Sequence, residues 1–395
     1  MTPPVSGGGA PELVRGDRTA TAVVVLLFGF ALGQGMLVIP LLALAAGYDA
    51  AAVGLLASVS AISQVGMRLT LPRFLARFPD RTMMATSCAT LMASYLALLA
   101  SDVILAFVVA QLLQGTARAF FWTSSQTHAL RSPSGSQRGI AITTVFGNIG
   151  TMFGPAVAGV IATFVLHAPL VSGIVSAAAA LIASRWLDAL PVYERRTGRG
   201  RPGIWRRPGV DLACWSNVST GGWRAMLNSY VPVVLDAAGH PPAIIGVLLA
   251  LADALVTTSA ATLSRRPIRR VRRAIGVSVA ITATSLAVFP FVAGSAVAAA
   301  IAIAIQGLAS GVQMTLGPAL AGQSVAPGEQ GEAVAVAGTF RAASLLATPA
   351  AVSASLAVLA LPVAIATAAV VIAIPTAVVL ARTRAVPSPA RPTGG

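Results

Sequence analysis

The chain has 395 residues, of which 56% are hydrophobic and only 10% are charged, and it carries a formal net charge of +15. This composition excludes an ordinary soluble domain, in which about 25% of the residues are charged. Nucleic acid is not an expected partner either, because the positive charge lies in short segments between long apolar stretches rather than on a polar domain.

Twelve apolar stretches run along the chain, and each is near the roughly 20 residues that a helix needs to cross a bilayer. The predicted membrane-spanning helices cover residues 20–43, 51–71, 82–100, 102–127, 139–165, 168–189, 211–235, 242–263, 274–292, 295–321, 333–355 and 359–381. Most connections between them are short, so consecutive helices are expected to run antiparallel. The predicted fold class is therefore an all-α membrane protein with twelve transmembrane helices.

All 27 residues that carry positive charge are arginines, and all but three of them collect in every second connection between the apolar stretches. The arginine-bearing segments are residues 1–18, 68–81, 131–138, 185–207, 265–273 and 382–391. Positively charged loops stay on the cytoplasmic side of a membrane. Both termini are therefore predicted to lie in the cytoplasm, and the protein to be a multi-pass protein of the cell's inner (plasma) membrane.

The two halves of the chain resemble each other at an offset of 192 residues, which aligns Gly54 with Gly246 and Gln114 with Gln306. Parallel repeats of this kind, with a binding site at their interface, are a transporter architecture. We expect two pseudo-symmetric six-helix bundles. The predicted organisation is a disordered cytoplasmic tail (1–18), a first bundle (19–189), a cytoplasmic linker (190–208), a second bundle (209–382) and a disordered cytoplasmic tail (383–395).

A glycine- and proline-rich motif, GTMFGPAVAG, occupies residues 150–159 in the fifth span. Gly154 and Ala158 belong to a stripe of small residues that permits close helix packing, and Pro155 removes one backbone donor. A tight helix contact with no further role is one explanation. The motif also resembles the G-x-x-x-G-P-x-x-G-G pattern of proton-coupled exporters of the major facilitator superfamily, with Ala158 replacing one glycine. This resemblance implies a conformational role for Gly150, Gly154, Pro155 and Gly159.

The chain is similar to twelve-helix members of this superfamily over nearly its whole length, but the loop after the second span departs from the family pattern. Residues 72–81 lie where the superfamily has G-x-L-x-D-R-x-G-R-R, and Ala76 replaces the aspartate. The cytoplasmic gate that the resemblance implies is therefore weakened or rebuilt around Asp80. The residues predicted to form it are Arg73, Arg77, Asp80 and Arg81.

Three arginines and one aspartate lie within apolar spans, where charge is expensive and usually functional. They are Arg118, Arg224, Arg341 and Asp253. Arg224 and Asp253 are on consecutive helices, so we expect them to pair. The pair can be purely structural. Alternatively, Asp253 carries the coupling proton and Arg224 sets its proton affinity, since burial and a neighbouring charge move the pKa of a carboxyl group.

Polar side chains within the spans are the candidates for a substrate cavity. Gln111, Gln114, Arg118 and Trp122 share one helical face, and similar residues recur elsewhere. The predicted cavity residues are Gln34, Gln111, Gln114, Arg118, Trp122, Asn148, Asn228, Gln306, Gln313 and Arg341. For the glutamines, hydrogen bonding between helices is the alternative. The excess of arginine over aspartate favours neutral or anionic substrates.

These features predict a secondary active transporter, and not an enzyme, that works as a monomer in the lipid bilayer. The expected activity is proton-coupled efflux (antiport) of small, drug-like organic molecules. The alternatives are proton-coupled import of organic anions and a transporter-like membrane sensor. The sequence has no glycine-rich phosphate loop, which argues against ATP-driven transport, and its three scattered histidines lack metal-ligand spacing. No cofactor or metal is expected.

Overall fold

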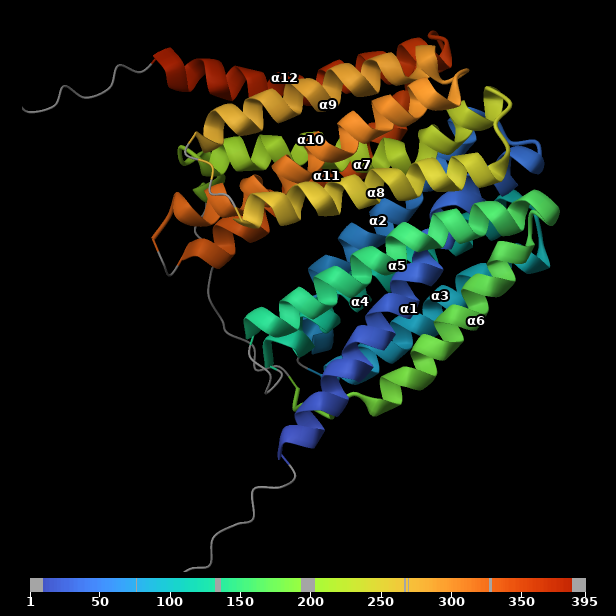
Figure 1. The fold of residues 1–395 in the computed structure, drawn as a ribbon, viewed down its shortest axis with the longest axis vertical. Coiled ribbons are helices and arrows are strands. Elements are labelled where there is room, and N and C mark those ends of the chain that lie inside the picture. The colour runs from blue at the N-terminus through green and yellow to red at the C-terminus, as the bar shows by residue number, and fades with distance from the viewer. Residues whose placement is uncertain are drawn as a thin grey trace, which may run out of the picture.

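The computed structural model describes residues 10–75, 77–131, 136–192, 203–265, 268, 270–326 and 329–385. Over these residues the chain is helical without any β-strand, and all twelve predicted helices are confirmed (Figure 1). They are α1 (Ala10–Ala45), α2 (Ala50–Leu75), α3 (Asp80–Ala100), α4 (Ile104–Arg131), α5 (Ser136–Phe164), α6 (Ala168–Ala183), α7 (Val210–Ala237), α8 (Pro242–Arg265), α9 (Val271–Val292), α10 (Ala296–Gln323), α11 (Gln330–Ser355) and α12 (Leu361–Ala385). Two short 3-10 helices, η1 (Ser184–Trp186) and η2 (Ile204–Arg206), lie between α6 and α7.

Helix α1 begins at Ala10, well before the predicted start at residue 20, so residues 10–18 are helical and not a disordered tail. The buried carboxylate of Asp17 explains the extension. It lies 3.0 Å from His128 Nε2 on α4 and accepts a hydrogen bond of 3.0 Å from the backbone N–H of Asp188. The remaining tail residues, 1–9 and 386–395, lie outside the described part of the chain, as do residues 193–202 of the predicted linker.

Helix α7 differs from the other helices in its polarity. Eleven helices in the described part of the chain are long and apolar enough to cross a membrane, and α7 is not among them. It contains Arg224 and a series of polar residues, but most of its side chains, including Asn217 and Thr220, are buried. Because α7 packs against α1, α2, α10, α11 and α12, its surroundings are protein rather than lipid, and a lower hydrophobicity is sufficient there.

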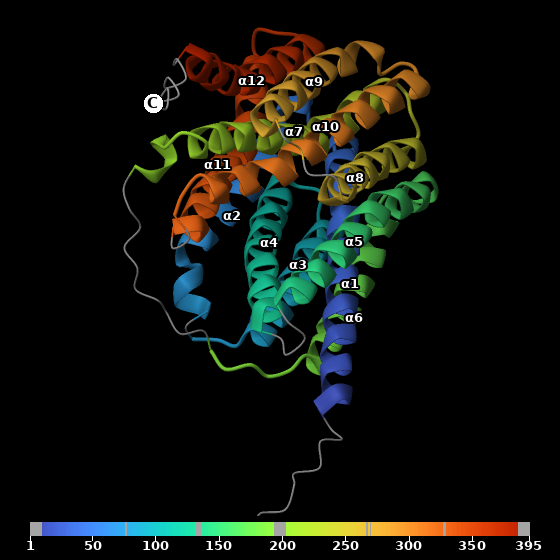
Figure 2. The same cartoon turned by 60° about the vertical axis from the view of Figure 1, so that its left-hand side comes forward.

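The helices form two bundles, α1–α6 and α7–α12, as the fold class predicts (Figures 1 and 2). One apolar core joins α1, α3, α4 and α6, and a second joins α7 to α12. Leu37 and Leu41 of α1 belong to the second core, so α1 also packs against the opposite bundle. The main contacts between the bundles are made by α5 with α8, α2 with α11, and α1 with α7.

The bundles meet at the end of the molecule that carries the connections without arginine, here called the arginine-poor end. Ser353 on α11 donates a hydrogen bond of 2.7 Å to the backbone oxygen of Ala51 on α2. A Cβ on Gly54 of α2 would lie only 1.9 Å from the Tyr230 hydroxyl of α7. In Figure 1, α5 and α8 adjoin at this end and separate toward the opposite, arginine-bearing end. The structure is therefore closed at the arginine-poor end.

Candidate functional site

Arg224 and Asp253 form the predicted ion pair, which joins α7 to α8. Arg224 Nη1 donates to Asp253 Oδ1, and Arg224 Nη2 donates to Asp253 Oδ2 at 3.2 Å. The side chains are only 18% and 10% exposed. A bidentate arginine–carboxylate pair has fixed geometry and is stronger than a pair of neutral hydrogen bonds. The pair therefore links two helices that also contact the first bundle, α7 through α1 and α2, and α8 through α5.

Arg118 reaches the same region from the first bundle. It lies on α4, close enough to Arg224 for the two positive charges to repel each other, and near the hydroxyl of Tyr95. Its Nη2 atom is 3.5 Å from Gln114 Oε1, which is a long hydrogen bond. Among the described residues, no carboxylate lies within ion-pair distance of Arg118. The interface therefore combines two arginines with one aspartate, and Arg118 carries the uncompensated charge.

Three of the predicted polar residues gather between the bundles. Gln111 of α4 and Asn228 of α7 line one small cavity of about 10 Å³, which holds about one water molecule. Gln34 of α1 lies one helical turn before Leu37 and is fully buried, and neither its amide oxygen nor its amide nitrogen has a hydrogen-bond partner among the described residues. Buried polar atoms without a partner are costly, so these atoms are candidates to bind water or a substrate.

Gln306 and Gln313, which were predicted to line the cavity, instead connect helices within the second bundle. Gln306 Oε1 accepts a hydrogen bond of 3.1 Å from the indole N–H of Trp223, and Gln306 Nε2 donates to the Ser285 oxygen at 3.3 Å. Gln313 Nε2 donates to the Thr282 hydroxyl at 2.8 Å. Both glutamines are buried, so in this conformation the hydrogen-bonding alternative describes them.

Trp122, Asn148 and Arg341 are the remaining predicted cavity residues, and all three are partly buried. Trp122 is partly buried and packs edge-on against Phe121, with ring centroids 5.6 Å apart. Asn148 is partly buried, and its backbone oxygen accepts a hydrogen bond from Thr151 at 3.2 Å. Arg341 is partly buried on α11, and its backbone oxygen would lie 2.5 Å from a Cβ on Gly221 of α7.

The glycine motif of α5 makes two separate close contacts. A Cβ on Gly150 would lie 2.3 Å from the Leu26 oxygen of α1, and one on Gly154 would lie 2.5 Å from the Phe30 oxygen. A Cβ on Gly159 would instead lie 2.4 Å from the Pro242 oxygen of α8. The predicted tight packing is therefore present. Gly150 and Gly154 pack against α1 within the first bundle, and only Gly159 packs against α8 of the second bundle.

Pro155 takes part in the contact between the bundles as well. A Cβ on Gly246 of α8 would lie 2.2 Å from the Pro155 backbone oxygen and 3.1 Å from the Gly159 Cα atom. The close approach of α5 and α8 at the arginine-poor end therefore requires a glycine on each helix, Gly159 and Gly246. The internal repeat aligns Gly246 with Gly54. Gly54 also has no side chain at a close contact, because the Tyr230 hydroxyl lies where its Cβ would be, at the same end of the molecule.

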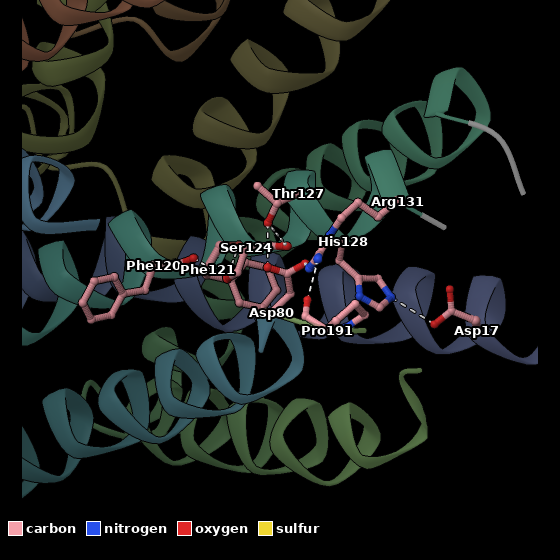
Figure 3. Close-up of polar contacts among 9 residues, drawn as sticks. All are labelled: Asp17, Asp80, Phe120, Phe121, Ser124, Thr127, His128, Arg131 and Pro191. Atoms are coloured by element: carbon pink, nitrogen blue, oxygen red, sulfur yellow. Dashed lines mark hydrogen bonds and ion pairs between the residues drawn. The ribbon is translucent and has the colours of Figure 1, made fainter. Parts of the chain in front are cut away.

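The predicted cytoplasmic gate is centred on Asp80, but its partner is Arg131 at the end of α4 (Figure 3). Asp80 is buried, pairs with Arg131 Nη2 and accepts a hydrogen bond of 2.9 Å from Thr127. Arg131 Nη1 also donates to the Pro191 oxygen at 2.5 Å. Sequence reasoning missed Thr127 and Arg131 as partners of Asp80, because they lie 47 and 51 residues away from it along the chain.

The other predicted gate residues do not join this ion pair in the described structure. Arg81 Nη1 donates to the Leu187 oxygen at 3.4 Å, and the side chain of Arg77 is exposed. The side chain of Arg73 lies outside the described residues. All the described contacts of Asp80 lie within the first bundle, so this network holds α3, α4 and the chain after α6 together rather than the two bundles.

A model of the Major Facilitator Superfamily matches residues 20–349 of the chain. A mutant of the nucleoside transporter NupG superposes with a TM-score of 0.74 at 14% identity, over 93% of this chain and 99% of that one. A bacterial homologue of the human lysosomal transporter Spinster, in an inward-facing and unoccupied conformation, gives 0.70 at 12% identity, over 96% and 98%. The human organic anion transporter MFSD10 gives 0.63 at 14% identity, over 93% and 99%. No curated protein matches the chain significantly.

Proposed function

Because the chain belongs to the Major Facilitator Superfamily, we propose that it is a proton-coupled secondary transporter that exports small organic molecules, neutral or anionic, by alternating access. The observation that carries the proposal is the Arg224–Asp253 ion pair at the interface between the bundles, facing the uncompensated Arg118. The resemblance of the α5 motif to that of proton-coupled exporters supports the direction of transport.

Asp253 is the proposed proton carrier. Its ionised carboxylate neutralises Arg224, so protonation breaks the ion pair and leaves two repelling arginines at the interface. One proton thus changes the charge of the whole site. A substrate that binds only beside the intact pair must alternate with the proton, and this alternation is the condition for antiport.

Import of organic anions is a second candidate, and the excess of arginine at the interface favours it. An anion that replaced Asp253 at Arg224 would leave a buried carboxylate without its counter-charge, and that carboxylate would take up a proton. Anion and proton would then cross the membrane together. The direction in which a pH gradient drives the substrate therefore separates the two candidates.

The proposal is tested with purified protein in liposomes under an imposed pH gradient. Substrates are first found by a thermal-shift screen, because a ligand that binds the folded state raises its apparent stability. With the extracellular side acidified, we expect a bound ligand to move out of the cytoplasmic compartment against its gradient. Movement in the opposite direction would establish import, and a ligand that binds but is never transported would establish a sensor.

The arginine pattern also predicts the orientation of the chain. We propose that the arginine-bearing end faces the cytoplasm, so the end at which the bundles meet is closed to the outside. A cysteine at exposed Asp236 should react with an impermeant thiol reagent on intact cells, whereas one at exposed Arg382 should react only after lysis. The native Cys88 and Cys214 are buried and give little background. Labelling of both positions on intact cells would contradict this orientation.

A further inference from the structure

An apolar groove of about 520 Å³ lies between α7, α11 and α12, apart from the residues of the proposed site. The α11 wall consists of small residues, since Ala343, Ala347 and Ala351 lie one turn apart and are all exposed. The α12 wall includes Thr367 and Val371, whose side chains are also exposed. The groove is therefore open along its length to the surroundings of the second bundle.

The groove lies at the depth of the hydrocarbon core of a bilayer. Its α11 wall runs from Phe340 to Ser355, which at a rise of about 1.5 Å per residue corresponds to roughly 22 Å of a core about 30 Å thick. Both α11 and α12 are apolar enough to span the membrane. What surrounds such a groove at this depth is lipid, and the most abundant ligand of matching shape and polarity is an acyl chain.

The arginine-bearing end of the groove has the residues of a membrane interface. Trp215 and Phe340 line the groove and stack edge-on, with ring centroids 5.2 Å apart, and Trp205 packs against Phe340 at 5.9 Å. The exposed guanidinium of Arg206 lies 5.0 Å from the Trp205 ring centroid. Tryptophans and arginines at one membrane boundary are typical of contacts with lipid headgroups.

Two exposed arginines, Arg206 and Arg382, follow the helices and aromatic residues at this end of the groove. Arg206 lies beside the aromatic cluster, whereas its neighbour Arg207 is already bonded to Glu329, with Nη1 2.5 Å from Oε2. Those hydrogen bonds raise the pKa of Arg207 further above its usual value. Arg382 is exposed and follows Pro375 of the groove by seven residues, which places it on the same face of α12.

We propose that this groove binds one acyl chain of an anionic phospholipid, whose phosphate contacts Arg206 and Arg382. The chain fills the space beside the alanines of α11 and completes the packing between α11 and α12. Because Ser353 on α11 contacts α2, the lipid lies directly behind one of the helices that close the arginine-poor end. The bound lipid thereby supports the helix that closes this end.

Native mass spectrometry tests the proposal on the full-length protein, equilibrated with equal amounts of dioleoyl-phosphatidylglycerol and dioleoyl-phosphatidylcholine. Two arginines near a phosphate correspond to a preference for the anionic lipid on the order of tenfold. The Arg206→Gln, Arg382→Gln double variant should lose this preference and still retain lipid. Equal retention of both lipids by the unmodified protein would overturn the headgroup assignment.

The location is tested by filling the groove. The Ala347→Leu, Ala351→Leu variant should retain several-fold less phosphatidylglycerol, whereas Ala354→Leu, at an exposed position of α11 that does not line the groove, should retain the normal amount. Unchanged retention in the filled variant would overturn the assignment. If the filled variant does not yield folded protein, the surface glutamine variant decides the proposal, because an unaltered lipid preference would overturn it.

Discussion

Replacing Asp253 with asparagine is expected to abolish transport driven by a pH gradient while leaving exchange of substrate without a gradient partly intact. Asparagine keeps the shape of the side chain and one oxygen that can accept a hydrogen bond from Arg224, but it cannot take up and release a proton. Uphill transport in liposomes should therefore fall to the background level. Counterflow of labelled substrate at equal pH should remain measurable.

If the Arg224–Asp253 ion pair is purely structural, a different outcome is expected. Removing one partner of a buried ion pair costs about 3–5 kcal/mol when the other charge is left alone, so Asp253→Asn would chiefly lower the thermal stability. The double variant Asp253→Asn, Arg224→Gln removes both charges and should then recover both fold and coupled transport. Recovery of coupling in the double variant would exclude Asp253 as the proton carrier. The carrier would then have to be Glu332, at the arginine-bearing end of α11.

Replacing Gly246 with leucine should open the arginine-poor end. A Cβ at Gly246 would lie 2.2 Å from the Pro155 oxygen of the other bundle, so a leucine fits only if α5 and α8 separate. Overpacking costs about 1–3 kcal/mol, which shifts a two-state equilibrium by roughly fivefold to about 150-fold. The reporter is Ser353→Cys, because Ser353 is buried at the same end and should react with an impermeant thiol reagent only after opening.

Gly154→Leu is the control for Gly246→Leu, because a side chain at position 154 of α5 would clash only with α1 of the same bundle. A Cβ at Gly154 would lie 2.5 Å from the Phe30 oxygen of α1. We therefore expect lower thermal stability without faster labelling of the reporter. Gly16→Leu, at an exposed position of α1 where nothing lies within 4 Å, controls for leucine in a helix and should change neither quantity. Equal labelling in the Gly246 and Gly154 variants would contradict the assignment of these contacts.

The helices and the ion pair could be predicted from the sequence because their signals are local. Apolar length indicates a helix in a membrane without reference to any other part of the chain. Arg224 and Asp253 lie on consecutive helices joined by a short connection, and this adjacency was the basis for expecting them to pair. The small-residue stripe of α5 likewise predicts close helix packing without indicating which helix is the partner.

The contact partners of the other polar side chains and of the α5 glycines depend on the tertiary structure. Asp80 pairs with Arg131, and Gln306 bonds to Trp223 from 83 residues away, contacts that no spacing along the chain indicates. The same holds for Gly154 and Gly159, which look alike in sequence but face different bundles. The apolar groove arises only where α7, α11 and α12 come together. Hydrophobic length determines most of the segments that become helices, but it does not determine which helices pack together. The contacts between α1 and α5 and between α7 and α11 are far more extensive than those between the consecutive helices α7 and α8. Which polar groups then meet depends on the rotation of each helix against the others, and side-chain packing sets that rotation.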